Sequence, residues 1–168
     1  MQTQELKLGD SILGDRIPKI EDKTILPFCE ATVMEVQRMS CVAPGAIPHI
    51  ANEDGELAGW KIPKGTLVTY NIHKFHTDPD YWVDPMTFSP ERFLTGKKKE
   101  QFVPYGLGKR ICMGESLARN ELFLFSTLIL QNFKIGLAIG HEKPDPEKWE
   151  AGVTRVPLPF YVNISMRQ

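Results

Sequence analysis

Two stretches of the chain space their apolar residues as helices do. Residues 26–45, LPFCEATVMEVQRMSCVAPG, predict a helix with a proline in its first turn and a Pro-Gly pair beyond its end. Residues 115–133, ESLARNELFLFSTLILQNF, predict the strongest helix of the chain. The second half of that helix, residues 122–130, is apolar on nearly every side, which predicts that it lies deep in a core.

Shorter patterns indicate strands and an irregular loop. Residues 57–72, LAGWKIPKGTLVTYNI, predict two short strands joined through a Pro-Lys-Gly turn. Residues 155–166, RVPLPFYVNISM, alternate as a strand does. Residues 76–94, HTDPDYWVDPMTFSPERFL, contain three Asx-Pro or Ser-Pro steps, which predict short turns and a packed irregular loop.

The long apolar helix needs more neighbours than these elements offer. A helix that is apolar all round must be covered on every side, and the chain predicts few other long helices. Either the core is mostly sheet, or part of the protein lies outside this chain.

Composition excludes several classes of protein. The 168 residues are 42% hydrophobic, enough for one domain with a fair core, and a net charge of -1 does not favour a nucleic-acid partner. Three cysteines without a C-x-x-C spacing argue against a disulfide framework and for a reducing compartment. No apolar run approaches the roughly 20 residues that a membrane-spanning helix needs.

The most informative stretch is residues 102–114, FVPYGLGKRICMG. Cys112 precedes the predicted long helix, whose positive end favours an anion, and Lys109 and Arg110 add positive charge. The glycines allow tight turns and the close approach of a flat group. No second cysteine or histidine lies at zinc spacing, so a metal here must bring most of its ligands, as haem iron does. The alternative is a buried structural cysteine in a glycine-rich turn.

These residues closely resemble the haem-binding motif of the cytochrome P450 family, F-x-P-Y-G-x-G-x-R-x-C-x-G. The resemblance implies that Cys112 is the axial ligand of a haem b iron and that Arg110 pairs with a haem propionate. Tyr105 departs from the family, which usually has phenylalanine there, and its hydroxyl needs a partner and can alter the potential of the iron. The other residues implied to contact the haem are Phe102, Gly106, Gly114 and Ala118.

A second family motif lies in the first predicted helix. Glu35 and Arg38 are three residues apart, a spacing that by itself is common on exposed helices. Their neighbours are mostly apolar, however, and charges in such a place require partners. The pair resembles the E-x-x-R motif of the family, and Arg92 in FSPERF resembles the arginine that completes its triad.

The resemblance also implies a substrate pocket. CVAPGAIPHI resembles the family segment that passes the haem, with His49 near a propionate. Small and aliphatic side chains suit an apolar substrate, although any core would also use them. The implied pocket residues are Val42, Ala46, Ile47, Val153 and Thr154. Residues expected to be structural, not functional, are His73, His76, Cys29 and Cys41.

Partners and location follow from the branch of the family. ELFLFSTLILQNF and GKRICMGE are similar to the microsomal drug- and steroid-oxidising branch, which implies an NADPH-dependent flavoprotein reductase, with a b-type cytochrome as a further partner, on the cytosolic face of the endoplasmic reticulum. Glu115 and Ser116 stand where mitochondrial relatives carry arginines for a ferredoxin. Lys109, with the cations at 97–99 and 119, is a candidate docking surface, or a solvated loop.

The resemblance implies an α+β fold that is mainly helical: the C-terminal part of the P450 fold, with small β-sheets and the haem-thiolate loop. Family members are much longer, so residues 1–168 are expected to be one partial domain, a C-terminal third. The N-terminal membrane anchor and the distal helix that delivers protons to oxygen are then absent from this chain. Such an absence would explain the long helix with too few neighbours.

The implied function is a monooxygenase that inserts one atom of O2 into an apolar substrate, such as a xenobiotic, a steroid or a fatty acid. No residue of the chain is expected to act as a general acid or base. The alternatives are a truncated, inactive fragment and a reductase-independent haem-thiolate isomerase. A cysteine hydrolase that uses Cys112 and a histidine is a weaker alternative, because the sequence places no histidine demonstrably close.

Overall fold

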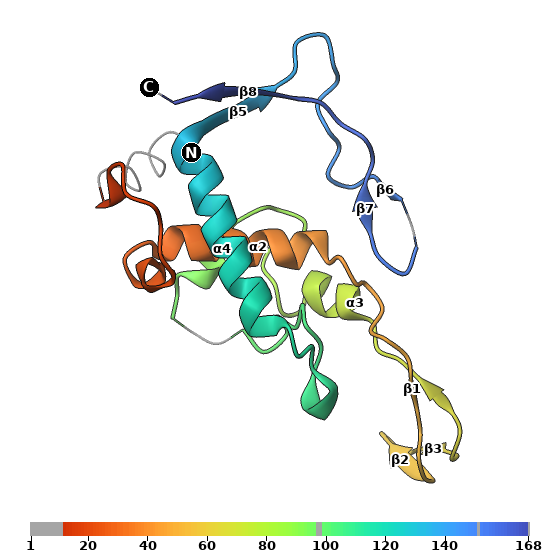
Figure 1. Cartoon of the computed structure of the whole chain (residues 1–168). Coiled ribbons are helices and arrows are strands. Elements are labelled where there is room, and N and C mark those ends of the chain that lie inside the picture. Colours follow the sequence, from red (N-terminus) through yellow and green to blue (C-terminus); the bar gives the residue numbers. More distant parts are fainter. Residues whose placement is uncertain (1–11, 97–98, 151, 168) are drawn as a thin grey trace.

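The computed structural model describes residues 12–96, 99–150 and 152–167. Two longer helices dominate it, and α4 crosses α2 near the middle of the molecule (Figure 1). The helical elements in chain order are η1 (Ile20–Thr24), α2 (Pro27–Ser40), α3 (Ile72–Thr77), η2 (Pro90–Phe93), η3 (Gly108–Arg110) and α4 (Glu115–Asn132), where η marks a 3₁₀ turn.

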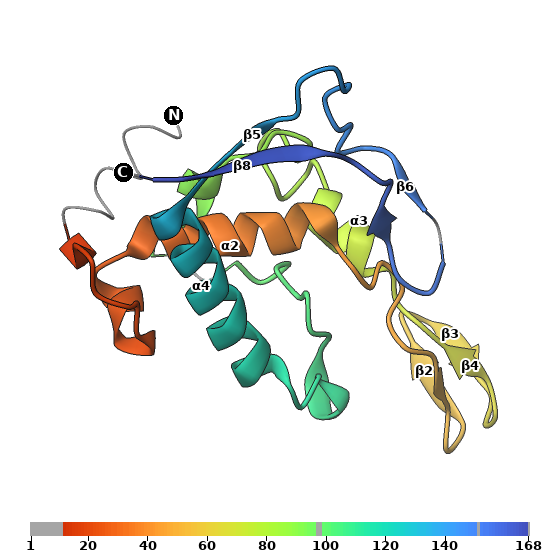
Figure 2. The same cartoon turned by 45° about the horizontal axis from the view of Figure 1, so that its top comes forward.

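The strands of the described residues pair into small antiparallel sheets of two strands each. The pairs are β1 (His49–Ile50) with β4 (Leu67–Val68), β2 (Gly55–Leu57) with β3 (Trp60–Ile62), β5 (Phe133–Leu137) with β8 (Val162–Met166), and β6 (Trp149–Glu150) with β7 (Val156–Pro157). The β5–β8 ribbon continues from the end of α4, while the β2–β3 hairpin projects away from both helices (Figures 1 and 2). Helices with small sheets confirm the predicted α+β class.

The first predicted helix is α2, and both of its ends are as expected. Pro27 occupies its first turn, where a missing backbone N–H costs nothing. The helix ends at Cys41, whose φ of 41° is left-handed and whose N–H donates to the Gln37 carbonyl at 3.1 Å. The chain therefore turns sharply away from the helix before the Pro-Gly pair.

The two strands predicted in residues 57–72 are present as β3 and β4, but they pair with other strands and not with each other. Ala58 and Gly59, both with positive φ, form a tight turn that returns β2 directly onto β3. The predicted strand in the tail is divided into β7 and β8. Pro157 and Pro159 explain the division, because proline donates no hydrogen bond to a sheet.

Two apolar clusters hold the fold together. The first joins Leu13, Leu26 and Phe123, so that the segment before η1, the start of α2 and α4 meet. The second is built from Cys41, Ala46, Ile72 and Val103, with the ring of Tyr70 packed against it. This second cluster ties the end of α2 and the start of α3 to the segment that leads into the glycine-rich loop.

The prediction that the second half of α4 lies deep in a core is wrong for this chain. In that half only Phe123 and Thr127 are buried, whereas Leu122 is 40% exposed and Phe125 is 60% exposed. Because α2 and η1 lie on one side of α4, its other apolar faces have no cover among the described residues.

His76 is a fully buried polar residue that connects α2 with the segment before the glycine-rich loop. Its ring Nε2 accepts a hydrogen bond from the Val103 N–H at 3.0 Å, and the ring stacks on Phe102 with centroids 5.7 Å apart. Its carbonyl accepts a hydrogen bond from the Arg38 guanidinium. Burial lowers the pKa of His76 to about 4, so the ring is neutral and can act as the acceptor.

We expect the free energy of unfolding to rise with pH between about 4 and the ordinary histidine value near 6.5, because in that window the unfolded chain protonates His76 and the folded chain does not. The contribution of His76 is about 3 kcal/mol, fully present above the window and lost as the pH falls through it. Urea unfolding at several pH values, compared with His76→Phe, measures it. An equal pH slope in the two proteins would contradict this assignment.

Candidate functional site

Cys112 lies on an exposed loop that leads directly into α4. Its sulfur is exposed, and its N–H donates to the Tyr105 carbonyl at 2.9 Å, which closes the loop at its base. Gly106 and Gly108 have φ values of +88° and +71°, a region that favours glycine, so the tight turns depend on these two residues. The exposed sulfur contradicts the alternative of a buried structural cysteine.

The third glycine of the motif has a different reason to be there. Gly114 is the N-cap of α4 with an ordinary φ of -84°, so its backbone angles, unlike those of Gly106 and Gly108, do not require glycine. A side-chain carbon at this position would lie 3.8 Å from the Cys112 sulfur. Glycine at this position therefore keeps one side of the sulfur open.

The neighbours of Cys112 in the sequence include exposed apolar and basic side chains. Ile111, Met113 and Leu117 are 45%, 102% and 63% exposed, respectively. Lys109 and Arg110 are exposed on η3. Exposed apolar side chains beside cations suit a flat, largely apolar group that also carries anions.

The hydroxyl of Tyr105 has a partner on α2. The Gln37 side-chain amide donates a hydrogen bond to it, although the two residues are 68 positions apart. The Arg119 guanidinium lies 5.1 Å from the centre of the Tyr105 ring and 5.7 Å from that of Phe102. Arg119 also pairs with Glu115 at 2.9 Å, and both side chains are 30% exposed.

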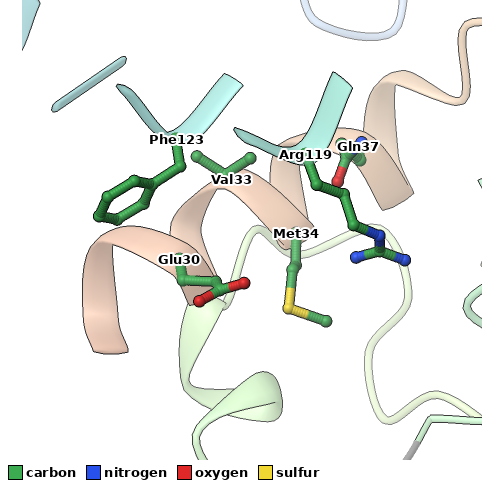
Figure 3. Close-up of a pocket in the computed structure, with 6 residues that line it drawn as sticks. All are labelled: Glu30, Val33, Met34, Gln37, Arg119 and Phe123. Atoms are coloured by element: carbon green, nitrogen blue, oxygen red, sulfur yellow. The ribbon is translucent and has the colours of Figure 1, made fainter. Parts of the chain in front are cut away.

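Figure 3 shows the narrow pocket between the two helices, to which α2 and α4 each contribute side chains. The helices bring Gln37 and Arg119 to one end of it and Phe123 to the other. None of the residues expected to contact substrate lines this pocket. A wider cleft of about 320 Å³ is lined by Pro44, Gly45, Thr69, Tyr70, Asn71 and His73.

Glu35, Arg38 and Arg92 form one buried ionic network. Arg38 donates from Nε and Nη2 to the two Glu35 carboxylate oxygens, each at 2.8 Å, and both side chains are fully buried. Arg92 Nε donates to Glu35 Oε1 at 3.0 Å, and the Ser89 N–H donates to the same oxygen at 2.9 Å. The carboxylate thus receives four hydrogen bonds, which offset the cost of burying its charge.

The remaining hydrogen-bonding capacity of Arg92 is used on a loop. Arg92 donates to the carbonyls of Val83 and Thr87, each at 3.0 Å. The ring of Trp82 lies against both guanidiniums, 5.3 Å from Arg38 Cζ and 5.8 Å from Arg92 Cζ. The irregular loop of residues 76–94 is therefore ordered by the same two cations that neutralise Glu35.

The residues expected to line a substrate pocket lie on two turns that the fold brings together. The Arg155 N–H donates to the Val42 carbonyl at 2.8 Å, so the turn with Val153 and Thr154 lies beside the end of α2. Val42, Ile47 and Val153 are 57%, 80% and 89% exposed, and Thr154 is exposed. Ala46 differs, because it is buried in the cluster with Cys41.

The other residues assigned to the haem or to docking lie on separate elements. His49 is half-buried in β1, opposite Val68 of β4. Ala118 lies in the first turn of α4, where its N–H donates to the Gly114 carbonyl at 2.9 Å. Lys97 and Lys98 lie outside the described residues.

The residues around Cys112 fit a haem. Among residues 12–96, 99–150 and 152–167, no group of three or more His, Cys, Asp or Glu side chains is placed to hold a metal ion. A metal at Cys112 would therefore need other ligands, which a porphyrin provides. The exposed sulfur, the open side at Gly114 and the neighbouring exposed apolar side chains accommodate such a flat ligand.

Comparison with known proteins decides the family. The model of the cytochrome P450 family matches residues 6–164. The chain belongs to the cytochrome P450 family. It is 48% identical to mouse cytochrome P450 2U1 and 39% identical to rat cytochrome P450 2B2 over 163 residues, which is 94% of this chain. It spans only 31% and 33%, respectively, of those two relatives.

Solved P450 structures show the same fold. A zebrafish cytochrome P450 solved with abiraterone superposes with a TM-score of 0.91 at 40% identity, covering 99% of this chain and 39% of that one. A zebrafish P450 structure with progesterone gives a TM-score of 0.89. The predicted P450 fold is thereby confirmed. No helix in the described part of the chain is long and apolar enough to cross a membrane.

The sequence did not single out four residues for the long-range contacts that they make: Gln37, Tyr70 and His76, which bond to the cysteine loop or the segment before it, and Arg155, which bonds to Val42. Gln37 offered a weak signal, because it precedes the motif arginine Arg38 on the same helix. The others bond across 27 or more positions of the chain, and no local pattern reports such contacts.

Removing one member of the buried network should destabilise the fold strongly. Glu35→Ala leaves the buried Arg38 charge without its partner, and we expect a loss of about 3–5 kcal/mol in urea unfolding. The matched control is Glu115→Ala, which breaks the more exposed pair with Arg119 and should cost less than about 1 kcal/mol. Equal losses in the two variants would show that burial of the Glu35 network contributes nothing.

The Tyr105 hydroxyl should contribute measurably to stability, although the family usually has phenylalanine there. We expect Tyr105→Phe to cost about 1 kcal/mol, because the Gln37 amide loses its acceptor. A double-mutant cycle with Gln37→Met, followed by urea unfolding, isolates the pair. A coupling energy near zero would mean that the hydrogen bond does not stabilise the loop.

Proposed function

We propose that this chain provides the thiolate side of a haem monooxygenase, which inserts one atom of O2 into an apolar organic substrate. The observation that carries the proposal is the exposed Cys112 sulfur, held on a closed loop at the start of α4. When bound, haem b supplies an iron that activates oxygen, and a thiolate ligand favours cleavage of the O–O bond.

The residues of the chain bind and orient this group. Cys112 binds the metal through its sulfur, next to Lys109 and Arg110 of η3 and directly before α4. Arg110 and His49 hold the propionates, and Phe102 is a further residue that we assign to the cofactor site. The further contacts that we assign to the cofactor come from Tyr105, Gly106, Gly114 and Ala118. The Glu35 network acts indirectly, by holding the segments around the loop.

The substrate side is supported by the exposed apolar turns. Val42, Ile47 and Val153, with Thr154, offer an apolar surface with one hydroxyl, which suits a xenobiotic, a steroid or a fatty acid. The related zebrafish structures hold abiraterone and progesterone, both of them steroidal and largely apolar. Ala46, buried in its cluster, would support this surface from behind.

Partners and location belong to the same proposal. An NADPH-dependent flavoprotein reductase supplies electrons and docks beside Lys109, which is exposed on η3, and a b-type cytochrome is a further donor. The enzyme works at the endoplasmic reticulum membrane, as expected of its microsomal relatives. Residues 1–168 act as one partial domain.

One observation favours the alternative that this chain is inactive by itself. Phe125 and Ile129 of α4 are 60% and 45% exposed, and large exposed apolar faces are rare in stable monomers. The chain also spans only 31% of mouse cytochrome P450 2U1. Haem binding and catalysis must therefore be tested separately.

The chain, expressed with haem supplied, reduced and exposed to carbon monoxide, should show a strongly red-shifted Soret band, because a thiolate is bound to the iron. Cys112→Ser should abolish the shift, whereas Cys29→Ser and Cys41→Ser should retain it. Loss of the shift in either control, with Cys112→Ser unaffected, would identify a different ligand. A folded chain without a shifted band would favour the inactive alternative.

A further inference from the structure

A tyrosine outside the cysteine loop holds the turn at its centre. The Leu107 N–H donates a hydrogen bond to the Tyr70 hydroxyl oxygen at 2.9 Å, across 37 positions of the chain. Leu107 lies between Gly106 and Gly108, the two residues whose positive φ shapes the loop. The phenol therefore contacts the loop at its most sharply turned point.

The shape of the loop matches this phenol closely. A side-chain carbon at Gly106 would lie 2.8 Å from the Tyr70 hydroxyl oxygen, closer than real side-chain carbons approach other atoms. Gly106 is thus required for two independent reasons, its φ of +88° and the space that Tyr70 occupies. At Gly108, by contrast, an added carbon would meet no atom within 4 Å.

Tyr70 is itself held firmly. Its carbonyl accepts a hydrogen bond from the Ala46 N–H at 3.0 Å, and its ring packs against the cluster that contains Val103. The edge of the ring also meets Phe75, with centroids 6.4 Å apart. These contacts fix the position of the hydroxyl independently of the loop. The loop therefore takes its position from the hydroxyl, and not the reverse.

We propose that Tyr70 is a positioning residue for the cysteine loop, and through it for the Cys112 sulfur. The proposal rests on the proposed function, since it gives the thiolate loop its geometry. Tyr70 fixes the Leu107 amide, and the bond from the Cys112 N–H to the Tyr105 carbonyl closes the same loop. From α2, the Gln37 amide donates a hydrogen bond to the Tyr105 hydroxyl. Tyr70 and Gln37 therefore bind the loop at different groups, the Leu107 amide and the Tyr105 hydroxyl.

Tyr70→Phe removes the acceptor and leaves the ring. In the full chain without haem, we expect amide hydrogen exchange of the peptide covering 105–111 to become about fivefold faster, the effect of losing one hydrogen bond. The matched control is Tyr161→Phe, which removes an exposed phenol directly before β8. It should leave exchange of this peptide unchanged. Unchanged exchange in Tyr70→Phe overturns the proposal.

A second pair of variants tests the close approach. Gly106→Ala should lower the urea midpoint, and it should lower it less when Tyr70→Phe is already present, because the hydroxyl that obstructs the new carbon is gone. Part of the loss should remain in the double variant, since φ at Gly106 still disfavours alanine. Strictly additive losses also overturn the proposal.

A spectroscopic measurement separates positioning from simple structural support. With haem, reductant and carbon monoxide, the fraction of haem that gives the red-shifted thiolate band should fall in Tyr70→Phe and stay constant in Tyr161→Phe. An unchanged fraction in Tyr70→Phe counts against a positioning role. If no variant and not even the parent chain gives the band, the proposed function fails, while the exchange and urea results still decide whether Tyr70 holds the loop.

Discussion

The fold of this P450 chain depends on the hydrogen bonds and ion pairs made by the buried carboxylate of Glu35. It accepts hydrogen bonds from two arginines and a backbone amide, and the Glu35 and Arg38 side chains are fully buried. Two positive charges around one carboxylate leave a net positive charge, and the carbonyls of His76, Val83 and Thr87 accept further hydrogen bonds from the two arginines. A segment with little regular structure, residues 76–94, is thereby connected to α2 by charge and not by strand pairing.

The same connection continues to the cysteine loop. Arg38 bonds to the carbonyl of His76, and the neutral ring of His76 accepts the Val103 N–H just before the loop. A neutral ring is needed, because imidazolium has no acceptor nitrogen, and burial provides it by lowering the pKa. The ionic network and the loop are therefore linked through one residue, which explains how charges on α2 can support a distant sulfur.

The exposed apolar surface marks the faces of the described chain that are open to further contacts. Cys112 and its apolar neighbours are open to solvent, as are the turns with Val42 and Val153. Burial of such surface is the main driving force of ligand and chain association, so these faces favour contact with a cofactor, a substrate or further protein. In the described part of the chain the second half of α4 has the same character, with Phe125 60% exposed.

Local features of the sequence determined much of this picture. Pro27 and the helical spacing predicted α2. The glycine-rich motif singled out Cys112 as the candidate metal ligand, and the order of E-x-x-R, PERF and the cysteine motif indicated the family. Each of these depends on neighbouring residues or on fixed spacing, which a linear pattern records. Tertiary structure alone decided the partners of those residues: Gln37 with Tyr105, Tyr70 with Leu107, and β3 with β2 instead of β4. These contacts depend on the path of the backbone between distant segments. The burial of α4 was likewise decided by which neighbours are present to cover it, and no pattern within the helix contains that information.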